Sequence, residues 1–409
     1  MTLPGPDQYD QNSASGAGGF PSPLAQQPGL TPPAPITSSS VSPVPLQAKA
    51  PRRSGRSAPI WIGGILVLLL IALVGYFLEF IGTGASFLGA ILALVPLAGV
   101  LFAIRLVDRW EPEPRGLVAF GLAWGAIGAV AIALLVDLGL SLVFGSPDTY
   151  AAEVFSTVVR APIVEEVAKG LGLLIIYATA RRAIDGPVDG IVYGALIGAG
   201  FAFTENIQYF AISYLEGGVE QTSVTFFVRG IMSPFAHVMF TSVTGFALGL
   251  AARRGATTGQ AIGPWMLGLA GAIALHAFWN GSAVFTDFFS VYLVLQVPLF
   301  VLFIIGVIAL RREESRLTRA RLGEYAAAGW FTPQEVDMLA TPAGRRTGLA
   351  WAKTLQGDRT AIMKGFITDA TALAMARQRA VTGRDPQALE DERDLLAKTA
   401  AARAALLSV

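Results

Sequence analysis

The sequence has no cysteine and only two histidines among its 409 residues. Without cysteine the chain can form no disulfide, no thiolate nucleophile and no cysteine-ligated metal site. Charged side chains are also scarce, at 14% of the chain, and they sum to a net charge of +1. Because nucleic-acid binding depends on a large excess of positive charge, we expect no nucleic-acid partner. A chain that is 53% hydrophobic and contains 45 glycines is typical of a multi-spanning membrane protein.

Lysine and arginine are absent from the first 48 residues, which are rich in proline, serine, glycine and glutamine. Such a segment has too little apolar surface to offset the conformational entropy lost on ordering. We therefore predict that residues 1–57 form a disordered cytoplasmic region. It is not expected to be a signal peptide, because the first apolar segment begins only near Ile60 and follows a basic cluster.

The apolar segments that follow are each close to the ~20 residues that a helix needs to cross the hydrocarbon core. They cover roughly 60–80, 86–104, 117–144, 156–180, 190–214, 228–252, 262–286 and 289–310. We therefore predict an all-α polytopic membrane protein with about eight transmembrane helices within residues 58–312. Residues 313–409 are polar and helical in pattern, with a capping box from Thr332 to Glu335. They are expected to form a cytoplasmic helical tail.

Basic residues fall in alternate loops between the predicted spans. The pairs Arg181–Arg182, Arg253–Arg254 and Arg311–Arg312 follow the fourth, sixth and eighth spans. The positive-inside rule places these loops, and hence both chain termini, on the cytoplasmic side of the cell membrane. Arg160 and Arg229 depart from this pattern, but both lie at outer ends of spans, where long side chains can reach the interface.

Ionisable side chains lie inside four consecutive predicted spans. Glu165 and Glu166 are in the fourth, Glu205 in the fifth, His237 in the sixth and His276 in the seventh. Ionisable groups within a bilayer are costly, so each is a functional hypothesis by default. Counted from the outer ends at ~1.5 Å per residue, these positions lie some 13–15 Å below the outer surface. Four helices therefore bring carboxylate and imidazole groups to one depth.

Sequence spacing also links polar groups within single helices. Lys169 follows Glu165 by four residues and Glu166 by three, so it can reach either carboxylate along the helix surface. One glutamate can then be charge-paired while the other acts as a base. Asn280 lies one turn after His276, where an amide can orient the imidazole or donate to a developing oxyanion.

Each of these features also has a structural interpretation. A glutamate–lysine pair can simply stabilise a membrane helix, and an intramembrane histidine can hydrogen-bond to a neighbouring helix. Asp137, in the third span, has no partner that the sequence identifies, and Asp189, in the inner loop before the fifth span, is expected to be solvated.

The alternative function is that of a proton-coupled transporter or channel, since such proteins use relays of glutamate and histidine near the middle of the membrane. Inverted repeats would favour that class, but none is evident.

The motifs themselves resemble the PrsW family of intramembrane proteases. They are EEVAK (Glu165 to Lys169), FAFTE (ending at Glu205) followed by Asn206, the helix of His237, and HAFWN (His276 to Asn280). That family is similar to the CAAX-prenyl protease and bacteriocin-processing superfamily, in which the second motif ends in histidine instead of glutamate. The resemblance covers about residues 60 to 312. It implies hydrolysis of a peptide bond in a membrane-anchored, anti-sigma-factor-like protein, from the outer side of the bilayer.

By this resemblance, Glu165 and Glu166 would activate water. The remaining groups of the site would be Glu205, His237, His276 and Asn280, supported by Lys169 and Asn206. The family is described as metalloproteases, so a bound Zn²⁺ is one expectation, although the chain has no HExxH helix.

Two mechanisms remain open at the level of sequence. In the first, His237, His276 and Glu205 hold Zn²⁺ with an open position for water. In the second there is no metal: a glutamate paired with His237 deprotonates water, while His276 and Asn280 stabilise the oxyanion. The partners expected in both cases are a membrane-anchored protein substrate and the lipid bilayer.

Overall fold

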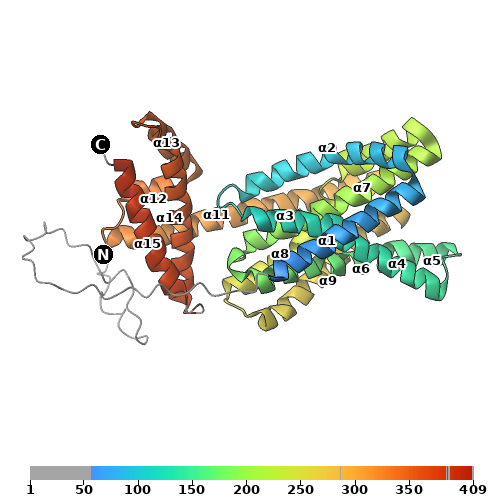
Figure 1. Ribbon diagram of the computed structural model, residues 1–409, viewed down its shortest axis with the longest axis horizontal. Coiled ribbons are helices and arrows are strands. Elements are labelled where there is room, and N and C mark those ends of the chain that lie inside the picture. Colours follow the sequence, from blue (N-terminus) through green and yellow to red (C-terminus); the bar gives the residue numbers. More distant parts are fainter. Residues whose placement is uncertain (1–56, 286, 384, 386, 408–409) are drawn as a thin grey trace, which may run out of the picture. The chain divides into compact units, whose positions relative to one another are not determined.

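The computed structural model describes residues 57–285, 287–383, 385 and 387–407 (Figure 1). Throughout these residues every regular element is a helix, which confirms the all-α prediction. The predicted disordered region, 1–57, lies outside the described residues except for its last position. The described helices belong to two compact units that divide between Arg316 and Leu317. We call them the membrane unit and the C-terminal unit.

The membrane unit consists of long helices joined by short turns and π-helical segments. Its α-helices are α1 Ser57–Tyr76, α2 Thr83–Asp108, α3 Arg115–Ala123, α4 Val130–Phe144, α5 Tyr150–Phe155, α6 Ala161–Thr179, α7 Pro187–Phe226, α8 Ala236–Arg253, α9 Thr258–Phe285, α10 Phe288–Val291 and the first part of α11 Val297–Ala327. The π-helical segments are η2 Phe77–Ile81, η3 Trp124–Ala129, η4 Ser156–Arg160, η6 Phe227–Met232 and η7 Tyr292–Gln296, and η5 Arg181–Ala183 is a 3₁₀ turn. Segments η4 and η6 directly precede the two stretches that carry EEVAK and His237.

Six of the described helical segments are long and apolar enough to cross a membrane. This number is smaller than the eight predicted spans for two physical reasons. The helix α6 carries Glu165, Glu166 and Lys169, and so has more charge than a simple apolar span. The fifth and sixth predicted spans lie together in one helical segment, Pro187–Arg253. The chain is a multi-pass membrane protein, as predicted.

The segment Pro187–Arg253 is interrupted at two places. Gly217 and Gly218 have non-helical backbone angles, and Gly218 has a positive φ of 63°, which a residue with a side chain rarely adopts. A second break occurs at 233–235, where Pro234 lacks the backbone N–H that would continue the helix. The helix α8 begins anew at Ala236, so His237 lies in its first turn.

The helix α7 packs closely against α8 through glycines spaced four residues apart. A Cβ atom built on Gly198 would lie 2.4 Å from the carbonyl oxygen of His237, and one on Gly194 would lie 2.7 Å from that of Thr241. Small residues at such intervals let the backbones of membrane helices approach each other. This close approach sets the helix of Glu205 directly beside the helix of His237.

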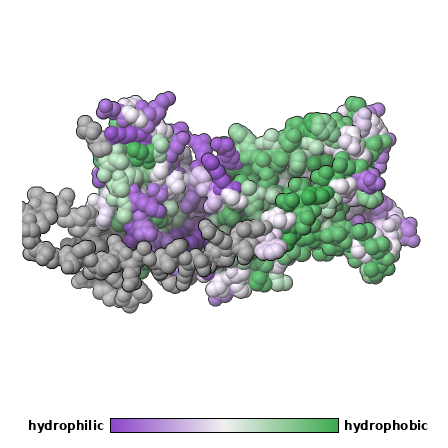
Figure 2. Space-filling model, in the orientation of Figure 1, coloured by the Kyte–Doolittle hydropathy of each residue, from purple (hydrophilic) through white to green (hydrophobic). Residues whose placement is uncertain are grey.

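The outer surface of the membrane unit is apolar, as Figure 2 shows in green over much of this unit. Large side chains such as Leu142 and Phe144 on α4 are 78% and 79% exposed. Such exposure of apolar side chains on spanning helices is expected where lipid is the solvent. By contrast, the core beneath contains buried polar groups, including Glu166, Lys169, His237 and His276.

The C-terminal unit contains the end of α11 and four further helices. They are α12 Pro333–Ala340, α13 Pro342–Thr354, α14 Thr360–Thr382 and α15 Ala388–Leu407. Thr332 and Glu335 exchange hydrogen bonds at the start of α12, which confirms the predicted capping box. Leu322, Phe366 and Leu373 are among the residues of its own apolar core. The predicted helical tail is therefore a packed helical unit.

Candidate active site

Helix α6 supplies a buried cation between two carboxylates. The Nζ atom of Lys169 lies 2.8 Å from Oε1 of Glu166 and 3.2 Å from Oε2 of Glu165, as the three- and four-residue spacing predicts. The lysine side chain is completely buried, and its ammonium lies 3.8 Å from the ring centroid of Phe201 on α7. The charge is therefore held by ion pairs and by an aromatic face instead of by water.

Glu166 is fixed from three sides, whereas Glu165 is not. Besides its contact with Lys169, Glu166 lies 3.1 Å from Nδ1 of His276 on α9 and accepts a hydrogen bond of 3.1 Å from Thr241 on α8. Its side chain is fully buried, whereas that of Glu165 is 14% exposed. Nε2 of His276 lies 4.0 Å from Oε2 of Glu165. Glu166 therefore orients other groups, and Glu165 is the carboxylate with access to a ligand.

His237 connects Lys169 to the carboxylate of α7. Its Nδ1 lies 2.9 Å from Nζ of Lys169, and its Nε2 lies 2.9 Å from Oε2 of Glu205. An ammonium group can only donate, so Nδ1 accepts, and Nε2 carries the proton and donates to Glu205. The hydrogen-bond network thus assigns the tautomer of this imidazole.

Arg229 on η6 belongs to the same cluster. It pairs with Glu205, donates from Nε to Oδ1 of Asn206 at 2.8 Å, and lies 3.8 Å from the ring centroid of Tyr209. From its place in the sequence, Arg229 was expected at the outer end of a span, with its side chain reaching the interface. Its departure from the positive-inside pattern is the signal by which it could have been found. Asn206 therefore supports Glu205 through a shared arginine.

Asn280 lies beside the cluster and binds a different partner. Its Nδ2 donates a hydrogen bond of 2.9 Å to the carbonyl oxygen of Thr157 in η4. This contact ties α9 to the segment that leads into α6. The neighbouring Trp279 packs against Phe240 and Phe300, and Phe240 stacks on His276 with ring centroids 4.9 Å apart.

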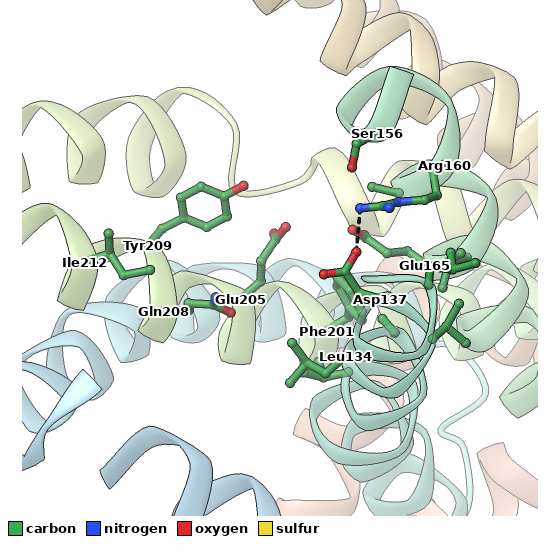
Figure 3. A pocket seen from close by; sticks show the side chains of 16 residues that line it. Leu134, Asp137, Ser156, Arg160, Glu165, Phe201, Glu205, Gln208, Tyr209 and Ile212 are labelled. Carbon is green, nitrogen blue, oxygen red and sulfur yellow. Dashed lines mark hydrogen bonds and ion pairs between the residues drawn. The ribbon is translucent and has the colours of Figure 1, made fainter. Parts of the chain in front are cut away.

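A cavity of about 450 Å³ leads to the cluster from between α4, η4, α6 and α7. Glu165 and Glu205 both line it, so both carboxylates are reachable from one space (Figure 3). At its edge, Nη2 of Arg160 lies 2.6 Å from Oδ1 of Asp137. Asp137, for which the sequence suggested no partner, is therefore ion-paired with the second arginine that departs from the positive-inside pattern.

The donor atoms fit a divalent metal. One ligand atom each from Glu165, His237 and His276 lie within 4.8 Å of one another. Two imidazoles and one carboxylate are an accepted catalytic zinc set. Each imidazole also contacts a further carboxylate through one ring nitrogen, Nδ1 of His276 with Glu166 and Nε2 of His237 with Glu205, which is how proteins orient metal-binding histidines. In this set the carboxylate is Glu165 and not Glu205, whose oxygen is already bonded to Arg229 and His237.

Comparison with known proteins identifies the segment that holds this cluster. Residues 113–303 match the family model described as PrsW family intramembrane metalloprotease. We call this segment the PrsW-family domain, after the family model that it matches. The family resemblance seen in the motifs is thereby confirmed, and the matched residues include every member of the Glu/His cluster.

Three curated relatives of the PrsW-family domain carry the name Protease PrsW. The protein of Clostridioides difficile (strain 630) is 32% identical over 157 residues, which are 38% of this chain and 63% of the relative. The protein of Geobacillus kaustophilus (strain HTA426) is 30% identical over 39% of this chain and 64% of the relative. The protein of Bacillus subtilis (strain 168) is 28% identical over 39% of this chain and 66% of the relative. The chain thus spans slightly less than two thirds of these relatives' length. No solved structure matches the chain.

Proposed function

We propose that the PrsW-family domain is an intramembrane peptidase that hydrolyses a peptide bond of a membrane-anchored protein. The observation that carries this proposal is the cluster of Glu165, Glu166, Glu205, His237 and His276, drawn from four helices and reached by one cavity. A buried group of carboxylates and imidazoles that opens on a cavity is the arrangement expected of a site for activating water.

In this proposal Glu165 is the general base. It is the α6 carboxylate that lines the cavity, and its Oε2 lies 4.0 Å from Nε2 of His276, close to the separation that one bound water can bridge. Glu166 holds His276 by its Nδ1 atom, so Nε2 is directed toward Glu165. Nε2 of His276 can then receive the proton that Glu165 takes from water and donate it to the leaving amine.

If a metal such as Zn²⁺ is bound, Glu165, His237 and His276 would hold it. It would supply a Lewis acid and a water of lowered pKa. In that state Glu166 and Glu205 keep the two imidazoles oriented. Lys169 has to release Nδ1 of His237, because a nitrogen that accepts a proton donor cannot bind a metal at the same time.

The substrate in this proposal is an anti-sigma-factor-like protein held in the membrane by a single span. The site lies in the outer half of the bilayer of the cell membrane, and both chain termini are cytoplasmic. This orientation rests on the basic residues of alternate loops and on the shared depth of the four ionisable positions.

The experiment is a cleavage assay in cells that express the chain with a tagged single-span reporter. Wild type should release a truncated reporter, and Glu165→Gln and Glu166→Gln should each abolish this release while the protein accumulates to the same level in the membrane. Persisting cleavage in both variants would rule out the peptidase proposal.

Metal analysis of the purified protein separates the two forms of the mechanism. If a metal is held by Glu165, His237 and His276, wild type should contain it stoichiometrically, and His276→Ala should lose it. A metal content that is unchanged in His276→Ala would place the ion elsewhere. Thr241→Val is a suitable control, because Thr241 contacts Glu166 but offers no ligand to the metal.

A further inference from the structure

The ion pair at the edge of the cavity lies in an unusual place. Asp137 is 57% exposed, and its neighbours on α4, Leu135 and Leu138, are 61% and 56% exposed. The residue is seven positions from the end of α4 at Phe144, or roughly 10 Å along the helix. A carboxylate and a guanidinium among lipid-facing leucines are costly, and such groups mark a functional path.

The peptide bonds of an intact helix are hard to reach. Their N–H and C=O groups bond to one another along the helix axis, and side chains cover them to an overall diameter of ~10 Å or more. A peptide bond that meets Glu165 in the cavity therefore has to leave this ladder of hydrogen bonds, so the segment around it enters unwound.

An unwound segment in lipid has free backbone N–H and C=O groups, which are costly until they find partners. The edge of the cavity offers one donor group, Arg160, and one acceptor group, Asp137. Together they carry no net charge, so they suit neutral backbone groups better than an anionic lipid headgroup, which requires an excess of positive charge. Leu134 and Ile212 supply apolar wall for a side chain.

We propose that this cavity binds an unwound stretch of a transmembrane segment, and that Asp137 and Arg160 exchange their mutual ion pair for hydrogen bonds to its backbone. Arg160 donates to a freed carbonyl, and Asp137 accepts from a freed amide. The inference deepens the proposed peptidase function and rests on it for its purpose. Binding, however, can be measured without cleavage, so the two can fail separately.

The test exploits the absence of cysteine from the chain. In a Glu165→Gln background, Leu134→Cys places one thiol on the cavity wall, and Leu138→Cys places one on the same helix outside the cavity lining. The probes are two synthetic transmembrane peptides in liposomes, each with one cysteine. One is a uniform leucine–alanine helix, and the other has a central Gly-Pro pair that frees backbone groups.

Under mild oxidation, the Gly-Pro peptide should form a disulfide with Leu134→Cys about tenfold more than the uniform peptide does, since an unpaired buried donor or acceptor is costly. Leu138→Cys should react equally with both peptides. Equal reaction of both peptides at Leu134→Cys would overturn the proposal, and the cavity would then be filled by lipid chains. Cross-linking of the Gly-Pro peptide in a protein whose wild type cleaves nothing would overturn the peptidase function alone.

Adding Arg160→Gln separates a binding role from a structural one. If Arg160 binds the freed backbone, the preference of Leu134→Cys for the Gly-Pro peptide should disappear while reaction with the uniform peptide is unchanged. A pair that merely holds η4 against α4 would lower both reactions together and leave their ratio intact. That unchanged ratio would contradict the role assigned to Arg160.

Discussion

The membrane unit contains two groups of buried or half-buried carboxylates that differ in how their charge is compensated. In the candidate site, Glu165 and Glu166 contact Lys169, and Glu205 contacts Arg229. Each of these carboxylates has a cation within hydrogen-bond distance. The site therefore holds charged groups together at close range, with the cation supplied by the fold itself.

The second group lies where the α2–α3 loop meets the start of α7, and its donors are mostly neutral. The backbone N–H groups of Asp185 and Gly186 donate to Asp189 at 2.9 Å, and the hydroxyl of Tyr193 donates to Glu113 at 2.6 Å. Burial, together with the nearby charges of Asp108 and Asp185, raises the pKa of Glu113 to about 8.

The two groups of carboxylates have different roles. Asp189 accepts a hydrogen bond from the backbone N–H of the N-cap residue Gly186, so the second group fixes the start of the helix that carries Glu205. Carboxylates that are fixed by neutral donors hold an element in place. Carboxylates that share cations with imidazoles, beside a cavity, are arranged to bind and activate a ligand.

Removing the central cation should have the largest effect. We expect Lys169→Met to lower the free energy of unfolding by ~3–5 kcal/mol, because it leaves buried carboxylates without their counter-charge, and to abolish cleavage. Denaturant unfolding of the purified protein measures this. The control is Lys364→Met on α14, an exposed lysine, which should change little. Equal stability of the two variants would mean that the site does not depend on its cation.

Removing the ion pair between Arg229 and Glu205 should have an intermediate effect on cleavage. We expect Arg229→Gln to lower kcat for the reporter by ~10–100-fold with little change in KM, because Arg229 holds Glu205, which orients His237. Arg253→Gln removes another arginine–glutamate pair, with Glu313, outside the site and serves as the matched control. A loss in Arg229→Gln no greater than in this control would remove Arg229 from the site.

The second group of carboxylates should make the free energy of unfolding depend on pH. Folding raises the pKa of Glu113 to about 8, so the folded state binds its proton more tightly than the unfolded state does. Stability should therefore decline as pH rises from the ordinary glutamate range to about 8, with a slope of at most ~1.4 kcal/mol per pH unit. Glu113→Gln keeps an acceptor for Tyr193 and should flatten this slope. An unaltered slope would show that Glu113 titrates normally.

Much of the site could be predicted from sequence because it follows from single helices. The spacing of Glu165, Glu166 and Lys169 predicts their contacts, and the orientation of successive spans predicts that Glu205 and the two histidines reach one layer. The fold class and the family also followed from apolar segments and motifs.

The rest depends on contacts between helices, which sequence spacing does not contain. Arg229 looked like an interfacial arginine, yet the chain folds back at the break of Gly217 and Gly218, so that Arg229 lies against Glu205. The expectation that Asp189 is solvated is wrong, since this side chain is buried and caps its own helix. The choice of Glu165 over Glu205 beside the two imidazoles required the geometry of four helices at once.

The most direct test compares the two carboxylate groups in one assay, with purified protein in liposomes and the single-span reporter. Glu165→Gln and Glu113→Gln each remove one half-buried carboxylate from the same membrane unit. We expect that Glu165→Gln abolishes cleavage and that Glu113→Gln retains it at pH 7. Cleavage that survives in Glu165→Gln would contradict the assignment of the Glu/His cluster as the hydrolytic centre.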